Sequence, residues 1–254
     1  MVDPSSIKLF VQDRLPIRFW SLGKSVYYWV RAIPCMGGNQ VTCPCCGHSL
    51  RRFVAFRGRP VLCPWCQSLE RHRLLYLYFQ EHTNLFQDQL KVLYFAPDAL
   101  ERKLRTSPNL TYISADLEDP HAMMKIDITA IPFPDASFDV ILCSHVLEHV
   151  PDDRKAMSEL YRVLKPSGWA ILLVPFDSAR TATFEDSSIT DTRERERIFG
   201  QRDHVRIYGQ DYVDRLKQAG FTVRQDTYGL QIDSLLHQKY GLPNYDDIFY
   251  CTHP

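Results

Sequence analysis

Short apolar runs alternate with a helical pattern from Lys91 onward, and this alternation limits the fold more than any other feature. Four apolar runs have the length of strands: KVLYFA (91–96), NLTYISA (109–115), FDVILCS (138–144) and WAILLV (169–174). The segment DRKAMSELYRVLK (153–165) instead has the spacing of an amphipathic helix. Strands separated by helices favour a parallel sheet covered on both faces. Because ligands of such sheets bind at the carboxyl ends of the strands, we expect the functional site there.

The composition indicates an ordinary folded protein. The 254 residues carry 30 basic and 30 acidic side chains, so no net field draws the chain toward nucleic acid. No apolar run reaches the roughly 18 residues of a membrane span, and the N-terminus lacks the apolar stretch of a signal peptide, so we expect a cytoplasmic protein. Residues 7–33 mix aromatic with basic side chains. They favour an element packed on the main domain, and peripheral contact with a membrane surface is the alternative.

Four cysteines predict a metal site ahead of the sheet. They follow the pattern C-x2-C-x16-C-x2-C, which is typical of zinc ribbons. Four thiolates saturate tetrahedral zinc and leave no position for water or substrate, so the metal should be structural. Disulfides are the competing explanation, but thiols stay reduced inside a cell. The expected ligands are Cys43, Cys46, Cys63 and Cys66, and Cys45 should face away from the metal.

The cysteine segment is also locally basic. Residues 41–82 carry six arginines against two glutamates, with Phe53, Phe56 and Trp65 among them. The arginines between residues 51 and 73 could hold RNA phosphates while the aromatic rings stack on bases. The alternative is the solvated face of a small ribbon.

The stretch from Asp127 to Pro175 resembles the class I S-adenosylmethionine-dependent methyltransferases, in particular their small-molecule branch. It contains IPFPDASFDVI entering a strand, VLEHV opening the next helix, and LYRVLKPSGWAIL leading into the fifth strand. Further along, YVDRLKQAGFTV looks like the family's helix and sixth strand, and DDIFYCTHP like its antiparallel last strand. The resemblance implies a doubly wound, seven-stranded Rossmann-like α/β sheet. The chain then divides into an N-terminal extension (1–40), a zinc ribbon (41–68) and a methyltransferase domain (69–254).

The resemblance also implies a site for S-adenosylmethionine. Asp116, ending the second strand, matches the acidic residue that holds the ribose hydroxyls. Asp127 and Ile128 match the pair beside the adenine, and Ser144 and His145 match positions beside the methionine moiety. Since strand-end Asp and Ser also cap helices, capping is the alternative role. The implied cofactor residues are Phe95, Ala96, Pro97, Asp98, Asp116, Leu117, Asp127, Ile128, Ser144 and His145.

The first loop departs from the family pattern. The family has a Gly-rich loop after an acidic residue, whereas the corresponding run here, VLYFAPDAL (92–100), contains no glycine. Glycine lets the backbone approach the cofactor and adopt unusual dihedral angles, and Pro97 removes a donor. Ala96 is the nearest small substitute, and Asp98 could begin the next helix and bind the cofactor's ammonium group. Loss of cofactor binding is the alternative.

Two histidines are candidate general bases for the acceptor. His145 follows the fourth strand, and His204 lies in RDHVRIYG, part of a polar insertion suited to a lid or an acceptor-binding segment. Imidazole titrates near neutral pH, although a hydrogen-bonded structural histidine is the alternative for each. Residues 145–149, HVLEH, also spell the zinc-protease pattern H-x-x-E-H. We reject that interpretation because it needs a third ligand and a long helix.

The sequence therefore predicts an enzyme that transfers a methyl group from S-adenosylmethionine to a small-molecule or sugar hydroxyl or amine. A methyltransferase acting on RNA bases, in which the basic ribbon binds the RNA, is the first alternative. A non-catalytic protein, whose ribbon binds a protein partner and whose cofactor site has degenerated, is the second.

Overall fold

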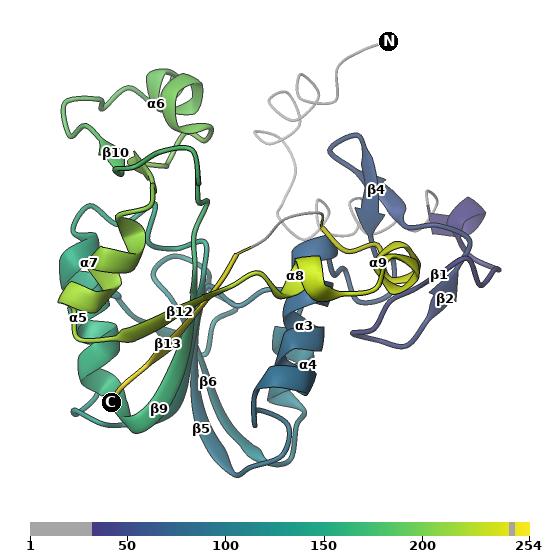
Figure 1. The fold of residues 1–254 in the computed structure, drawn as a ribbon, viewed down its shortest axis with the longest axis horizontal. Coiled ribbons are helices and arrows are strands. Elements are labelled where there is room, and N and C mark those ends of the chain that lie inside the picture. The colour runs from purple at the N-terminus through teal and green to yellow at the C-terminus, as the bar shows by residue number, and fades with distance from the viewer. Residues whose placement is uncertain (1–31, 244–246) are drawn as a thin grey trace.

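A seven-stranded mixed sheet forms the centre of the computed structural model, which describes residues 32–243 and 247–254 (Figure 1). The strand order is β12-β13-β9-β8-β5-β6-β7, and β13 alone runs antiparallel to its neighbours. This order confirms the predicted Rossmann-like sheet with an antiparallel last strand. The strands are β5 (Leu90–Phe95), β6 (Leu110–Asp116), β7 (Met124–Lys125), β8 (Phe138–Ser144), β9 (Leu164–Leu173), β12 (Thr222–Asp226) and β13 (Ile248–Thr252).

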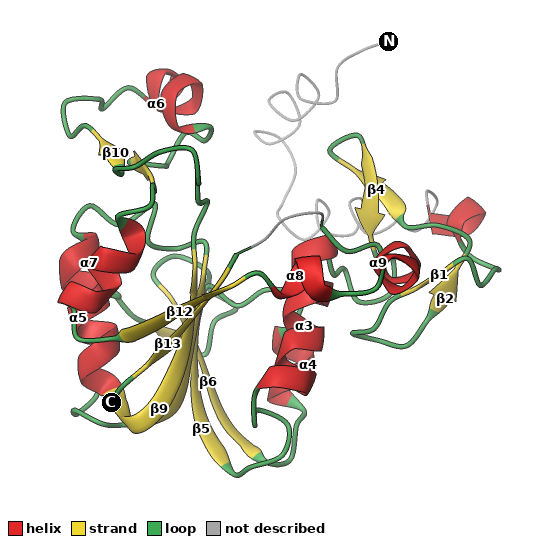
Figure 2. Ribbon diagram, viewed as in Figure 1, coloured by secondary structure: helices red, strands yellow, loops and turns green. Residues whose placement is uncertain are grey.

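The two faces of the sheet build two separate cores. In β8, Ile141 and Cys143 belong to one core while Val140 and Leu142 belong to the other, as the alternation of side chains along a strand requires. Helices α5 and α7 cover the first face, and α3, α4 and α8 cover the second (Figure 2). These helices are α3 (Glu70–His82), α4 (Glu101–Arg105), α5 (Asp153–Val163), α7 (Tyr212–Gln218) and α8 (Tyr228–Gln231).

The prediction that VLEHV opens a helix is wrong. These residues form a turn, in which His149 N donates to Val146 O, and α5 begins only at Asp153. Pro151 restricts the residue before it to extended conformations, which stops a helix from running through this point. Asp152 then caps α5, because its side chain accepts a hydrogen bond of 2.9 Å from Lys155 N.

The cysteine segment folds as two short hairpins beside the sheet. A left-handed pair at Arg57 and Gly58, with φ values of 47° and 81°, makes the tight turn of the second hairpin. Helix α9 (Ser234–Tyr240), from the C-terminal part of the chain, packs on the first hairpin. The strands are β1 (Val41–Thr42), β2 (Ser49–Leu50), β3 (Val54–Phe56) and β4 (Arg59–Leu62), preceded by a 3-10 turn, η1 (Ile33–Cys35).

Arg73, at the start of α3, joins the cysteine segment to the main domain. Its side chain is fully buried and stacks over the Phe53 ring at 3.9 Å. All three guanidinium nitrogens donate to backbone carbonyls, two in the cysteine segment and two at the C-terminal end of α9. Gly241 makes this contact possible, since a Cβ there would lie 2.6 Å from the Phe53 ring. The proposal that the arginines between 51 and 73 hold phosphates is therefore wrong for Arg73.

The polar insertion after β9 is anchored by an ion-pair network around two buried arginines. Arg215 donates to Asp153 at 3.0 Å and to Glu185 at 2.9 Å, and Arg206 donates to Glu185 at 2.8 Å. Arg206 also donates to the carbonyls of Leu147 and Pro151, so it holds the turn after β8. The insertion rises above the sheet as β10 (Phe184–Glu185), α6 (Thr192–Phe199) and β11 (Arg206–Ile207) (Figure 1).

Among the described residues, no helix is long and apolar enough to cross a membrane. The membrane-surface alternative concerned residues 7–33, and residues 7–31 of that segment lie outside the part of the chain that the structure describes.

Candidate cofactor and acceptor site

The carboxyl ends of β5, β6 and β8 lie side by side at one edge of the sheet. Phe95 pairs in register with Ala115 on one side and Cys143 on the other. The next residues along the three strands are Ala96, Asp116 and Ser144, so the structure brings these predicted site residues together. Ala96 N also donates to Ala115 O at 2.9 Å, which fixes the loop after β5 against β6.

Asp116 and Asp127 each use only one carboxylate oxygen within the described residues. Asp116 Oδ1 accepts from the backbone N–H groups of Glu118 and Asp119 at 2.7 and 2.8 Å. Asp127 Oδ1 accepts from Thr129, both from its backbone N–H and from its hydroxyl. Both carboxylates thus cap a turn, and the second oxygen of each remains available to a ligand.

Apolar side chains lie close to the two carboxylates. Leu117, directly after Asp116, is 51% exposed, and Met123 and Met124 are also exposed. Ile128 is instead buried in the core beneath them, and Phe95 is buried in the same core. An exposed leucine directly after a strand-end carboxylate suits an aromatic ring better than water.

Two residues at this edge hold left-handed backbone conformations that side chains disfavour. Ala96 has φ of 48° and His145 has φ of 57°. This conformation costs a residue with a Cβ about 1–2 kcal/mol, and residues with such unusual backbone angles are common at functional sites. The backbone at Ala96 therefore keeps a conformation that glycine adopts freely, although the loop contains no glycine.

Replacing Ala96 with glycine should stabilise the protein. Relief of the left-handed conformation outweighs the extra freedom of the unfolded chain, which leaves a gain of about 0.5–1 kcal/mol in the free energy of unfolding. Chemical denaturation measures this gain. Ala99→Gly is the control, because Ala99 has no positive φ and its replacement should destabilise. An Ala96→Gly protein no more stable than the wild type would show that the loop is unstrained.

Asp98 is held by its neighbours in the protein. Its Oδ1 accepts from Leu100 N at 2.8 Å, and its Oδ2 lies 3.0 Å from His72 Nε2 on α3. His72 Nδ1 accepts from Leu69 N, while His72 Nε2 approaches Asp98 without the alignment of a hydrogen bond. Burial raises the pKa of Asp98, but the His72 contact and the Leu100 hydrogen bond outweigh it and hold that pKa below its usual value. Asp98 thus ties the loop after β5 to α3.

Both predicted catalytic histidines lie beside Glu148. His145 Nδ1 is 3.4 Å from Glu148 Oε1, and His204 lies with Glu148 and His149 in one compact group. Glu148 and His204 are buried, and burial lowers the pKa of His204. Sequence reasoning missed Glu148 and His149 as site residues, although the HVLEH pattern marked them.

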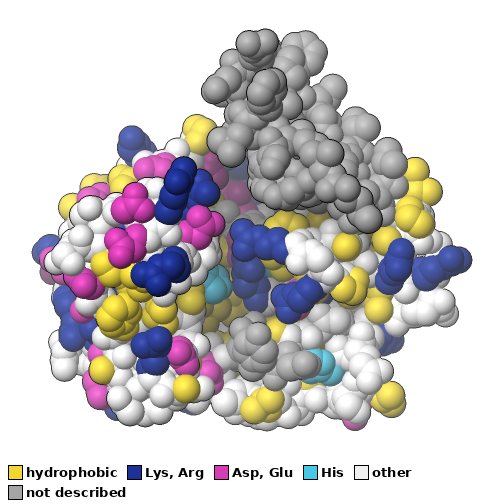
Figure 3. All heavy atoms as spheres, turned by 90° about the horizontal axis from the view of Figure 1, so that it is seen from above, with side chains coloured by type: hydrophobic (Ala, Val, Ile, Leu, Met, Phe, Trp, Pro, Cys, Tyr) yellow, Lys and Arg dark blue, Asp and Glu magenta, His cyan; other side chains and the backbone are white. Residues whose placement is uncertain are grey.

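A cavity of about 410 Å³ connects the end of β8 with the cysteine segment. Its lining includes His145 from the sheet edge and Leu242 and Pro243 from beyond α9. The hairpin β3–β4 and the start of α3 contribute Arg57, Arg59 and Arg71. Seen from above, Lys and Arg side chains gather beside a hollow in this face of the molecule (Figure 3).

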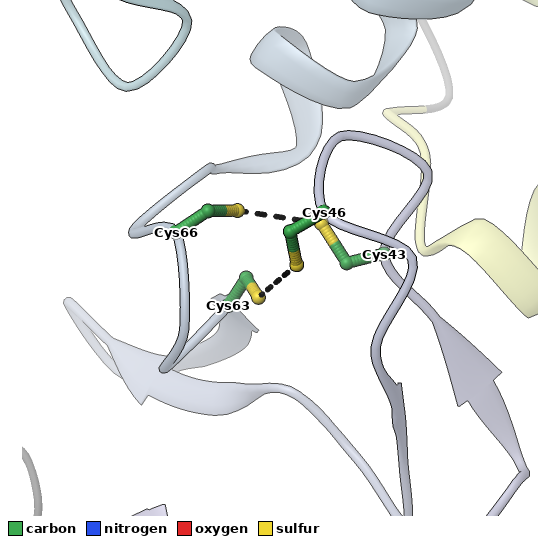
Figure 4. Close-up of side chains that lie close together, drawn as sticks. All are labelled: Cys43, Cys46, Cys63 and Cys66. Atoms are coloured by element: carbon green, nitrogen blue, oxygen red, sulfur yellow. Dashed lines mark hydrogen bonds between the residues drawn. The ribbon is translucent and has the colours of Figure 1, made fainter. Parts of the chain in front are cut away.

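The four predicted metal ligands converge on one point (Figure 4). The Cys43 and Cys66 sulfurs lie 3.5 Å apart, and the Cys46 and Cys63 sulfurs lie 3.7 Å apart. Around tetrahedral zinc with Zn–S bonds of about 2.3 Å, neighbouring sulfurs lie about 3.8 Å apart. The donor set and its spacing therefore fit a zinc ion. Cys45 is not a member of this group, and its sulfur lies 3.7 Å from the His72 carbonyl oxygen.

The two Cys-x-x-Cys turns have the same construction. Gly47 N donates to Cys43 O at 2.8 Å, and Gln67 N donates to Cys63 O at 2.9 Å. Gly47 and Gln67 both have positive φ, of 77° and 61°. The repeated turn presents each pair of sulfurs to the same point, as a four-thiolate site requires.

Comparison with known proteins agrees with this architecture. Residues 96–172 match the family model described as a methyltransferase domain. The ubiquinone/menaquinone biosynthesis C-methyltransferase UbiE of Enterobacter sp. (strain 638) is 38% identical over 72 residues, which cover 28% of this chain and 24% of the relative. UbiE of Pectobacterium carotovorum is 40% identical over 65 residues, covering 26% and 22%. The match thus spans about a quarter of the length of these relatives.

Among solved structures, the [4+2]-cyclase SpnF superposes with a TM-score of 0.54 at 14% identity, covering 92% of this chain and 95% of that chain. At this identity the likeness concerns the fold alone. The family match instead covers the segment from Ala96 through β8 and α5 into β9, which carries the strand-end residues described above. The strand order, the antiparallel last strand and the match of residues 96–172 to the methyltransferase-domain model agree with the resemblance to class I S-adenosylmethionine-dependent methyltransferases.

Proposed function

We propose that the chain binds S-adenosylmethionine at the carboxyl edge of the sheet and transfers its methyl group to an acidic small molecule in the adjoining cavity. One observation carries the proposal: within the described residues, Asp116 at the end of β6 and Asp127 just after β7 each keep an unpartnered carboxylate oxygen, and β5, β6, β7 and β8 end at one edge of the sheet. The 410 Å³ cavity begins at the same edge, at His145.

In this proposal each strand end has its own role toward the cofactor. The free oxygen of Asp116 accepts hydrogen bonds from the ribose hydroxyls, and that of Asp127 accepts from the adenine amino group. Leu117 covers the adenine ring, while Ser144 and His145 lie beside the methionine moiety. Asp98 orients the glycine-free loop through His72 and Leu100 rather than offering both oxygens to the ammonium group.

Methyl transfer depends mainly on alignment of the reacting atoms, because the sulfonium is already a good leaving group. The protein must hold the acceptor atom in line with the methyl carbon and sulfur, away from water. His145 lines the cavity and is the nearer candidate base for a hydroxyl or amine acceptor. His204 is buried and is not among the residues that line this cavity.

The arginines of the cavity favour an acceptor with an acidic group. Arg59 is paired with Glu70 at 2.6 Å, but Arg57 has no acidic partner within the described residues. Arg71 has a buried Nε without a hydrogen-bond partner. A phosphate or carboxylate on the acceptor would satisfy these donors. The ribbon, held by a structural zinc ion, would then select the acceptor by charge.

Replacing Arg71 with glutamine tests this selection. With labelled S-adenosylmethionine and a panel of phosphorylated, carboxylated and neutral small molecules, we expect methylation of acidic members only. Arg71→Gln should raise KM for such an acceptor about tenfold, with kcat nearly unchanged, because a charge-assisted hydrogen bond contributes about 1.5 kcal/mol or more. Arg105→Gln, on exposed α4, is the control and should leave KM unchanged.

Two outcomes would overturn the proposed acceptor class. Methylation of neutral and acidic compounds alike would remove the role of the arginines. Methylation of RNA alone, with steep loss of binding as salt rises, would favour the RNA alternative.

A further inference from the structure

One carboxylate and two imidazoles form a compact group behind the end of β8. The ligand atoms of Glu148, His149 and His204 all lie within 4.8 Å of one another. Two of the three residues come from the HVLEH turn and the third from the insertion, more than fifty residues further along the chain. The fold thus adds His204 to Glu148 and His149, whereas His145, the first histidine of the zinc-protease pattern, is not part of the group.

Two of the three residues, Glu148 and His204, have buried polar atoms without hydrogen-bond partners among the described residues, whereas His149 is partly exposed and its Nδ1 lies 3.2 Å from Asp203 Oδ2. Glu148 is 1% exposed, and neither of its carboxylate oxygens has a hydrogen-bond partner. His204 is 3% exposed, and its Nε2 also lacks a partner. A buried carboxylate without donors is costly unless a positive charge compensates it.

The adjacent buried arginine does not supply that charge. Arg206 is the adjacent buried cation, but its donors go to Glu185 and to the carbonyls of Leu147, Val150 and Pro151. His204 Nε2 has no hydrogen-bond partner among the described residues, so this nitrogen can offer its lone pair to a metal ion. A neutral imidazole and an ionised carboxylate are metal ligands.

The backbone holds the ligands in place. Val205 N, next to His204, donates to Glu148 O at 2.9 Å, so the insertion is hydrogen-bonded to the turn that carries the other two ligands. Arg206 holds the same turn from below. The arrangement is therefore built by long-range contacts and does not depend on a flexible loop.

We propose that Glu148, His149 and His204 bind a divalent transition-metal ion, at a site separate from the four cysteines. Two imidazoles and one carboxylate are a donor set of catalytic zinc sites and of other first-row ions, and three protein ligands leave a position open. His145, 3.4 Å from Glu148, stands between this site and the cavity. A hydroxyl group bound to such an ion would lose its proton more easily, which would activate a hydroxyl acceptor for methylation. This role of the metal rests on the proposed methyl transfer, whereas metal binding itself does not.

Zinc content of the full-length protein tests the proposal. After equilibration with zinc and removal of the excess, elemental analysis should find a second zinc ion per chain beside the one held by the cysteines. Glu148→Gln and His204→Gln should each lose that second ion and keep the first. His121→Gln, which changes an exposed histidine, should keep both.

Cobalt substitution separates the two sites, since only the cysteine site gives thiolate-to-cobalt charge-transfer absorption. Retention of that absorption shows that a variant still folds its ribbon. If the buried substitutions prevent folding, His149→Gln replaces them, because the His149 side chain is 32% exposed. A wild-type protein that takes up only the cysteine-bound ion, or variants that keep the second ion, would overturn the site.

Discussion

Replacement of Asp116 with alanine should weaken the binding of S-adenosylmethionine about a hundredfold. The free Asp116 oxygen lies where the ribose hydroxyls of the proposed cofactor would donate, and charge-assisted hydrogen bonds contribute about 1.5–3 kcal/mol each. A loss of about 2.8 kcal/mol corresponds to a factor of about a hundred in Kd. Titration calorimetry of the purified protein measures it.

Asp116→Asn separates ligand binding from the local fold. The asparagine carbonyl oxygen can still accept from Glu118 N and Asp119 N, so the turn is retained, while the charge that favours the ribose is lost. This variant should lose about tenfold in affinity without a change in stability. Asp119→Ala, on the exposed side of the same turn, should bind as the wild type does. Equal affinity in all four proteins would remove Asp116 from the site.

Replacement of Arg73 with methionine should destabilise the protein by about 3–5 kcal/mol. Methionine fills much of the volume but leaves four carbonyls without their donors: those of Val61, Ser68, Tyr240 and Gly241. Burial lowers the pKa of Arg73, yet its charge also lies near the cysteine ligands, where it opposes the net negative charge of a zinc–tetrathiolate centre.

Chemical denaturation and zinc retention measure the effect of Arg73→Met. We expect both a lower free energy of unfolding and faster loss of zinc to a chelator. Arg52→Met, on the exposed surface of the same segment, should change neither by more than about 0.5 kcal/mol. An Arg73→Met protein as stable as Arg52→Met would mean that the ribbon is joined to the sheet by other contacts.

The sheet and the cysteine centre could be predicted because their signals are local. The alternation of Val140, Ile141, Leu142 and Cys143 between two cores reflects the period of a single strand. The two Cys-x-x-Cys turns are likewise complete within a few residues, and each closes through its own backbone hydrogen bond.

The features that sequence reasoning missed depend on contacts between distant parts of the chain. Arg73 looked like a surface cation, but its partners Tyr240 and Gly241 lie 167 and 168 residues away in sequence. The turn after β8 looked like the first turn of a helix, but Pro151 interrupts it and Arg206 holds it in another shape. His204 reaches Glu148 through the same network. Local sequence patterns do not predict contacts between residues so far apart in the chain.

The left-handed conformation of Ala96 was only partly predictable from the sequence. A glycine-free loop suggested loss of the cofactor site, since glycine usually supplies such conformations. The backbone nevertheless adopts φ of 48° with alanine, held by the Ala115 carbonyl on one side and the Asp98 capping bond on the other. Residue type alone would not have revealed this, because the conformation is imposed by the neighbouring strand.

The structure of the full-length protein crystallised with S-adenosylhomocysteine tests the central claim most directly. We expect the ribose hydroxyls within hydrogen-bond distance of Asp116, the adenine over Leu117 beside Asp127, and the sulfur next to Ser144 and His145, facing the arginine-lined cavity. A ligand bound elsewhere, or none at this edge of the sheet at saturating concentration, would contradict it.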